Sequence, residues 1–169
     1  MIGVAIAASG AVVAGFGHFW IAGILVLLGA VFDMLDGGIA RRSNTVGPQG
    51  ALMDSVLDRV SEVAVLVGLV VYYSRPESAN QTAVILAIVA TAGSLMVSYV
   101  RARAEGLGFK GTEGFLTRPE RVVIMSVLLL AGQPVWALWI LGVGTPLSAT
   151  QRFVAAYREA GRPIDEAGD

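Results

Sequence analysis

The sequence contains no cysteine and few charged residues. It has 169 residues, of which 15% are charged, whereas roughly 25% is usual for a globular protein. Without cysteine, disulfides, thiolate metal sites and cysteine nucleophiles are excluded. The net charge of −1 gives no basic surface for nucleic acid, which we do not expect as a partner. The single histidine, His18, lies in a short break between apolar runs, and we interpret it as an interfacial rather than a catalytic residue.

Long apolar runs dominate the rest of the chain. Hydrophobic residues make up 55% of it, and the mean hydropathy is +0.70. A helix needs ~20 apolar residues to cross a bilayer. Candidate runs cover residues 1–16, 19–35, 50–73, 82–100, 121–132 continuing toward 144, and 134–157. They predict an all-α integral membrane protein built as a six-transmembrane-helix bundle. No charged residue precedes Asp33, so we expect the first helix to be truncated at its start.

The basic residues indicate how the helices are oriented. Of the 12 Lys and Arg residues, only Arg75 lies outside the segments 41–59, 101–121 and 152–162. Cytoplasmic loops carry the positive excess in membrane proteins. We therefore expect these three segments to face the cytoplasm, in a multi-pass protein of the cytoplasmic membrane.

Turn residues separate the predicted spans. Residues 106–114 include four glycines and predict a flexible loop. Thr117-Arg118-Pro119-Glu120 has the form of a capping box, which predicts a helix beginning near Arg118. No internal repeat is visible. We expect residues 1–160 to form a single membrane domain and residues 161–169 to form a disordered cytoplasmic tail.

Four aspartates lie at the ends of two neighbouring predicted spans. Asp33 and Asp36 are three residues apart at the end of one, and Asp54 and Asp58 are four apart at the start of the next. Each pair shares a helix face, and a short loop brings both pairs to the same depth. Four converging carboxylates repel one another unless a cation lies among them. Oxygen ligands without His or Cys suit Mg²⁺ or Mn²⁺.

Small residues and an arginine accompany these aspartates. Gly37 follows Asp33 by one helical turn, and Gly50 precedes Asp54 by one turn. Both would let a bulky ligand approach the backbone, and Arg41 could offer two hydrogen bonds to a phosphate.

Other interpretations of the aspartates remain open at this point. A pair at a helix end can be a solvated boundary, and a cation or proton transporter also uses membrane carboxylates. A UbiA-like prenyltransferase would bind a diphosphate through aspartates, but it would need more helices and differently spaced motifs.

The complete spacing resembles that of a known family. The sequence contains the pattern D-x2-D-G-x2-A-R-x8-G-x3-D-x3-D, which begins at Asp33 and ends at Asp58. This is similar to the signature of the CDP-alcohol phosphatidyltransferases, and all eight fixed positions are present. Members of that family transfer a phosphatidyl group from a CDP-lipid to an alcohol and release CMP.

The resemblance implies a role for each signature residue. Two Mg²⁺ ions, or Mn²⁺ in their place, would be held by Asp33, Asp36 and Asp54. Asp58 would be a ligand of one ion and also the general base. The CDP-lipid, CDP-diacylglycerol, would be bound by Gly37, Arg41 and Gly50. Family members often dimerise through membrane helices, so the resemblance also implies a homodimer.

Two further segments resemble the phosphatidylinositol phosphate synthases. These segments are SYVRARAEGLG, which begins at Ser98, and RPER, which begins at Arg118. The implied acceptor is inositol 1-phosphate, also named D-myo-inositol 3-phosphate. Its phosphate would be bound by Ser98, Arg101, Arg121 and Arg152, with Arg158 as the alternative to Arg152. A glycerol 3-phosphate acceptor would use similar arginines and remains the alternative.

Overall fold

The computed structural model describes residues 2–42, 47–109 and 114–161, and the side chains of 3–34, 47–109 and 114–161. Within these residues the chain forms six α-helices and a short 3-10 helix, without strands. They are α1 (Ile2–Gly15), α2 (Phe19–Arg42), α3 (Pro48–Tyr73), η1 (Pro76–Ser78), α4 (Gln81–Gly106), α5 (Arg118–Leu130) and α6 (Pro134–Ala160). The predicted all-α architecture is confirmed. The predicted tail falls outside the described residues after Gly161.

Two helices differ from their predicted lengths. Helix α2 continues to Arg42, beyond the apolar run that was expected to end at residue 35. Helix α5 begins at Arg118 as predicted, but it ends at Leu130 after 13 residues. Gly132 follows with a φ of +68°, a conformation that favours glycine and turns the chain. The run that was expected to continue toward residue 144 is therefore broken.

The predicted capping box forms only in part: the Glu120 carboxylate interacts with the backbone N–H of Thr117, but the reciprocal bond from the Thr117 side chain is missing. The side chain of Thr117, at the N-cap, accepts no hydrogen bond from the helix backbone. Its hydroxyl instead donates to the carboxylate of Glu120. The helix still starts where the sequence predicts, since Pro119 is well tolerated in a first turn.

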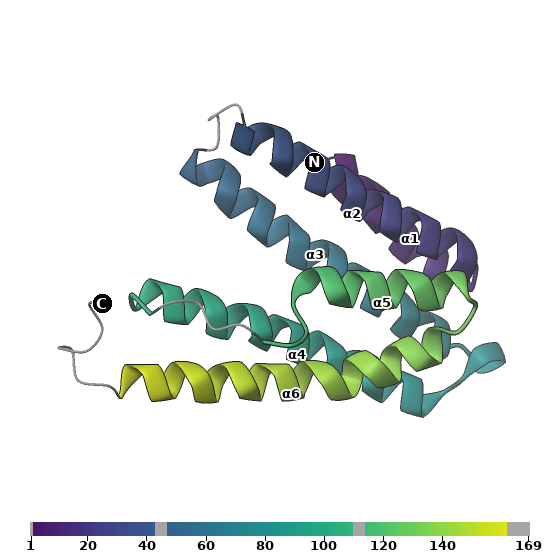
Figure 1. The fold of residues 1–169 in the computed structure, drawn as a ribbon. Helices are drawn as coiled ribbons and strands as arrows, with labels where there is room; N and C mark the ends of the chain where they lie inside the picture. The colour runs from purple at the N-terminus through teal and green to yellow at the C-terminus, as the bar shows by residue number, and fades with distance from the viewer. Residues whose placement is uncertain (1, 43–46, 110–113, 162–169) are drawn as a thin grey trace.

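The helices form two groups that diverge toward one end of the molecule (Figure 1). Helices α1, α2 and α3 pack together, while α4 packs along α6 and α5 lies against α6. Contacts of α2 with α5 and of α3 with α4 join the groups. The groups separate toward the end at which α2 finishes and α3 begins (Figure 1). Asp33 lies in the half of α2, and Asp58 in the half of α3, that point toward this end.

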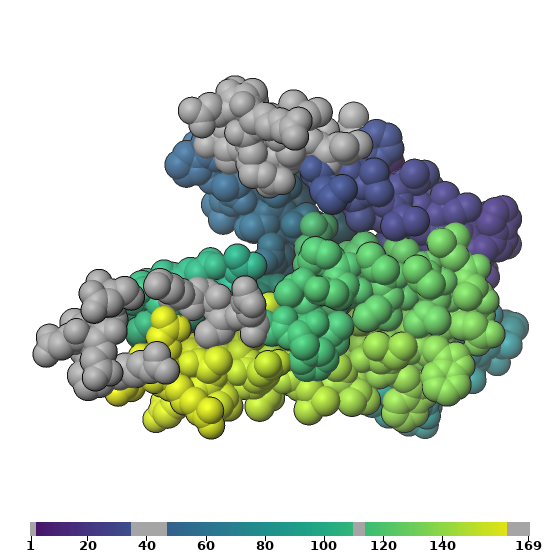
Figure 2. Space-filling view, viewed as in Figure 1, coloured from purple at the N-terminus to yellow at the C-terminus, as the bar shows by residue number. Residues whose placement is uncertain are grey.

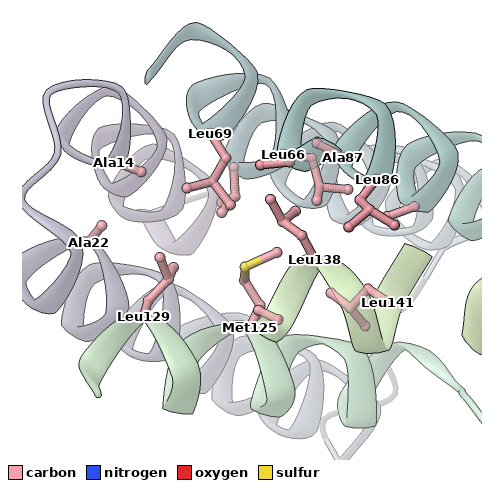
Figure 3. Close-up of a cluster of buried hydrophobic side chains, with 14 of the residues drawn as sticks. Ala14, Ala22, Leu66, Leu69, Leu86, Ala87, Met125, Leu129, Leu138 and Leu141 are labelled. Atoms are coloured by element: carbon pink, nitrogen blue, oxygen red, sulfur yellow. The ribbon is translucent and has the colours of Figure 1, made fainter. Parts of the chain in front are cut away.

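Apolar side chains from all six helices fill the centre where the groups meet (Figure 3). Many members of this core are alanines, including Ala14, Ala22 and Ala87, and the larger members include Leu66 and Leu138. Small residues allow helix backbones to approach closely, as is typical of helix packing in membranes. The core thus sets short distances between helices.

Glycines mark the closest helix crossings. A Cβ atom at Gly68 of α3 would overlap the backbone oxygen of Ala11 in α1. A Cβ at Gly23 of α2 would lie 2.8 Å from the backbone nitrogen of Leu130 in α5. At both crossings the second backbone occupies the space that a side chain would need.

Large apolar side chains cover much of the outer surface. The exposed set draws on every α-helix and includes Val12, Trp20, Val67, Ile88, Val123 and Trp136. By length and apolar composition, α4 qualifies to cross a membrane, while Gly3–Gly15 and Phe19–Met34 are shorter apolar helical stretches. Only the described residues enter that assessment. The six predicted membrane spans are therefore matched by six helices, one of which meets the criterion for a span.

We predict that Gly68→Ala destabilises the protein, because the new methyl group must push α1 away from α3. Overpacking of this kind costs about 1–3 kcal/mol of unfolding free energy. Thermal or denaturant unfolding in detergent micelles would measure the change.

The matched control is Gly106→Ala, since a Cβ at Gly106 meets no atom within 4 Å. We expect this variant to unfold like the unmodified protein or slightly later. Equal stability of the two variants would contradict the close crossing of α1 and α3.

Candidate functional site

Asp33 and Asp58 meet at a single guanidinium group. Asp33 comes from the second half of α2 and Asp58 from the first half of α3. Nη2 of Arg118 lies 2.7 Å from Oδ1 of Asp58 and 4.0 Å from Oδ2 of Asp33. The two carboxylates are only 14% and 8% exposed. Two aspartates that the sequence places on different helices therefore converge on one cationic group.

Helix α1 packs directly against the carboxylate of Asp33. A Cβ atom at Gly3 would overlap the carboxylate oxygen Oδ1 of Asp33. The small residue at this position therefore allows α1 to cover the aspartate. Carboxylates shielded from water need a cation or hydrogen-bond donors nearby.

A second ion pair lies one helical turn farther along α3 and α5. Arg121 donates from Nε and Nη2 to the carboxylate oxygens of Glu62, at 2.6 and 2.9 Å. Its Nη1 donates to the carbonyl of Leu116 at 3.0 Å. The Arg121 side chain is 2% exposed. This bidentate pair fixes the start of α5 against α3, because all three nitrogens are used.

A narrow cavity runs between these charges and the apolar core. Its polar end is formed by Asp33, Asp58, Ser61, Glu62, Arg118 and Arg121. It offers about 30 Å³ to water, and a single water needs ≳10–15 Å³. The cavity thus holds a few waters at most and no nucleotide. Figure 2 shows the surface hollowed between the two helix groups beside the start of α5, which is where a larger ligand could approach.

The other signature residues are described only in part. Asp54 is exposed on α3, and its charge acts on Asp58, as does that of Asp33. A Cβ at Gly50 would meet no atom within 4 Å, so the backbone there is open. Asp36, Gly37 and Arg41 lie in the part of α2 whose side chains are outside the described residues.

The described aspartates can supply part of a divalent cation site. Among the described residues, no three His, Cys, Asp or Glu side chains gather as a metal-binding group, and Asp36 is outside that search. The oxygen donors of Asp33 and Asp58 nevertheless point at one position that a positive group occupies. This donor set fits a hard divalent ion such as Mg²⁺ or Mn²⁺. The predicted four-aspartate site remains a prediction.

Arg152, one of the predicted acceptor-binding residues, is buried on α6. It is covered by the segment before α5: a Cβ at Gly114 would come within 2.5 Å of its Nε. The backbone N–H of Leu116 donates to Ser148 Oγ at 3.4 Å, one turn before Arg152. The charges of Arg101 and Arg121 act on Arg152. Arg152 is therefore the predicted residue that lies within electrostatic reach of two others, Arg101 and Arg121.

Ser98 and Arg101 have different surroundings. Ser98 lines a groove of about 600 Å³ between α3 and α4, together with Arg59 and Tyr99. Arg101 pairs with Glu105 at 2.8 Å on the exposed surface of α4. No single described cavity collects all four predicted residues, and their joint role remains a prediction.

Sequence reasoning missed the parts played by Glu62 and Arg118. Glu62 lies four residues after Asp58, and Asp58 lies four after Asp54, so helical periodicity already places Glu62 on the acidic face. Arg118 and Arg121 are three apart and share a face of α5. Nothing in the sequence shows which acidic residue each arginine meets.

Comparisons with known proteins identify the family. A family model described as CDP-alcohol phosphatidyltransferase matches residues 1–150. The phosphatidylinositol phosphate synthase of Mycobacteroides abscessus is 34% identical over 152 residues, which cover 86% of this chain and 69% of that protein. The chain spans about two thirds of the length of the curated relatives compared, from 59% to 69%.

Solved structures share the fold. The phosphatidylinositol phosphate synthase of Mycobacterium tuberculosis with CDP-DAG bound aligns with a TM-score of 0.85 and 28% identity, covering 95% of this chain and 85% of that one. The same enzyme in complex with manganese and citrate aligns with a TM-score of 0.87 and 26% identity, covering 98% and 88%.

We predict that Glu62→Ala strongly destabilises the protein, because Arg121 would remain buried without its carboxylate partner. Breaking a buried pair in this way costs about 3–5 kcal/mol. Unfolding measurements in micelles would test this, with Glu105→Ala as the control. Glu105 belongs to an exposed pair, whose loss should cost below about 1 kcal/mol.

The double variant Glu62→Gln/Arg121→Gln should recover part of the loss, because neither charge then remains unpaired. If Glu62→Ala cost no more than Glu105→Ala, the buried pair would not anchor α5.

Proposed function

The chain belongs to the CDP-alcohol phosphatidyltransferase family, and from this we propose that it transfers the phosphatidyl group of CDP-diacylglycerol to inositol 1-phosphate. Membership makes it a transferase of phospholipid biosynthesis. The proposed products are phosphatidylinositol phosphate and CMP. The observation that carries this proposal is the convergence of Asp33 and Asp58 on one cation position.

Two divalent ions, Mg²⁺ or Mn²⁺, would be held by Asp33, Asp36, Asp54 and Asp58. When bound, they would neutralise the diphosphate and stabilise the departing CMP. The manganese in the related M. tuberculosis structure supports a divalent metal. The shielded positions of Asp33 and Asp58 support the same assignment, since buried carboxylates need a positive partner.

The protein side chains would orient and deprotonate the substrates. Asp58 would accept the proton of the acceptor hydroxyl as its oxygen attacks the phosphatidyl phosphorus, while the diphosphate P–O bond breaks and CMP leaves. Gly37, Arg41 and Gly50 would bind the CDP-lipid. The open space at Gly50 agrees with a ligand close to the backbone.

The acceptor phosphate would be bound by Ser98, Arg101, Arg121 and Arg152. The action of Arg101 and Arg121 on Arg152 supports grouping these residues, because an anion would relieve the repulsion at Arg152. Arg121 already uses its guanidinium on Glu62 and Leu116. A direct bond from Arg121 to phosphate would require that pair to rearrange.

We also propose a multi-pass protein of the cytoplasmic membrane with its active site facing the cytoplasm. Residues 1–160 would be one domain, which would form a homodimer. The many exposed apolar side chains support burial in lipid, since soluble monomers rarely expose such extended apolar patches. The earlier alternative of a cation or proton transporter has no support, because the family is one of transferases.

We predict that Asp58→Asn abolishes turnover but leaves CDP-diacylglycerol binding measurable. Asparagine keeps the size of the side chain but cannot accept the proton. Release of CMP would report turnover, and retention of radiolabelled CDP-diacylglycerol on the purified protein would report binding. Unchanged turnover in this variant would remove Asp58 from the role of general base.

We predict that inositol 1-phosphate supports CMP release from CDP-diacylglycerol, and that EDTA stops the reaction. Inositol and glycerol 3-phosphate should be compared in parallel, with lipid products identified by mass spectrometry. A lipid product from glycerol 3-phosphate alone would overturn the acceptor assignment and leave the family intact. Full activity in EDTA would overturn the metal assignment.

A further inference from the structure

We propose that Arg118 is the internal counter-ion of the aspartate site, and that a divalent cation must displace its guanidinium from between Asp33 and Asp58. The proposal rests on the proposed function in one respect, namely that these aspartates bind a divalent ion. It assigns to Arg118 a positioning role toward these two carboxylates.

The contacts of Arg118 carry the argument. One nitrogen, Nη2, reaches the carboxylates of two different helices, at 2.7 Å on Asp58 and 4.0 Å on Asp33. Helix α1 covers the far side of Asp33 through Gly3. The guanidinium thus contacts the carboxylates that α2 and α3 contribute to the site.

Electrostatics explains why a positive group is needed there. Two shielded carboxylates facing each other repel, and this repulsion would separate α2 from α3. The guanidinium of Arg118 offsets this repulsion. A divalent ion carries twice the charge and approaches carboxylate oxygens to about 2.0–2.1 Å when it is Mg²⁺. Both cations cannot share this space without repelling each other, so binding of the metal favours departure of Arg118.

Arg118 also has the freedom to leave, in contrast to its neighbour. Its side chain is 29% exposed, and its Nε has no hydrogen-bond partner within the described residues. Arg121 is 2% exposed and held through three nitrogens. The pair of Arg121 with Glu62 therefore keeps α5 in place when the guanidinium of Arg118 moves.

The test compares Mn²⁺ binding to Arg118→Gln and to the unmodified full chain in micelles without lipid substrate. Electron paramagnetic resonance of free Mn²⁺ would give the dissociation constants. A neighbouring opposite charge shifts proton binding to an aspartate by about one to three pKa units. We expect removal of the Arg118 charge to act on Mn²⁺ in the same sense, so that Arg118→Gln binds Mn²⁺ about tenfold more tightly or better. Arg103→Gln is the control, since Arg103 is exposed on α4, and its loss should change the affinity less than about twofold.

A purely structural role of Arg118 predicts the opposite result. Loss of a structural contact would loosen the site and weaken Mn²⁺ binding or leave it unchanged. Either result would overturn the proposal. Tighter binding accompanied by a larger Mn²⁺-induced rise in melting temperature than in the unmodified protein would support it.

A measurement on the unmodified protein covers the case in which Arg118→Gln does not fold. Phenylglyoxal modifies accessible arginines, and peptide mass spectrometry locates the modified residue. We expect saturating Mn²⁺ to increase the modification rate of Arg118 severalfold while Arg103 stays unchanged. An unchanged or slower rate at Arg118 would overturn the proposal. Failure of the unmodified protein to bind any Mn²⁺ would instead refute the metal assignment of the proposed function.

Discussion

Charged side chains between apolar helices remain there only when they are paired, because an isolated buried charge is very costly. Helix α5 meets this requirement through two arginines on one face. Arg118 joins the aspartates of α2 and α3, and Arg121 joins Glu62. The same contacts hold the two helix groups together at the point where they begin to diverge. Architecture and chemistry therefore depend on the same few ion pairs.

Short side chains make these pairs geometrically feasible. Aspartate reaches only a small distance from its backbone, so two aspartates on different helices meet only when the helices lie close. Gly23 brings α2 against α5, and a Cβ at Gly29 would lie 2.7 Å from the backbone oxygen of Gly3 in α1. Alanines in the core also allow the helix backbones to approach closely. Small residues at the helix crossings are therefore needed for the two aspartates to meet.

Much of this organisation could be predicted from the sequence. Long apolar runs predicted an all-helical chain, and the start of α5 at Arg118 followed from its turn residues. The spacing of Asp33 and Asp58 predicted that they could converge, since they lie at similar distances along the chain from the connection between their helices. The Arg121–Glu62 pair could not be predicted, because 59 residues separate its partners. The end of α2 was also missed, since polar residues after Asp36 resemble a loop but continue as helix to Arg42.

The shortness of α5 affects how far below the membrane surface the reacting groups would lie. Its 13 residues span about 20 Å, whereas the hydrocarbon layer of a bilayer is about 30 Å thick. In the proposed membrane arrangement, with the turn after Leu130 at one water interface, the first residues of α5 would lie about 10 Å inside the opposite one. A water-soluble acceptor would then have to descend into a hydrated recess to reach Asp58. The lipid head group would need to travel only sideways from the surrounding leaflet.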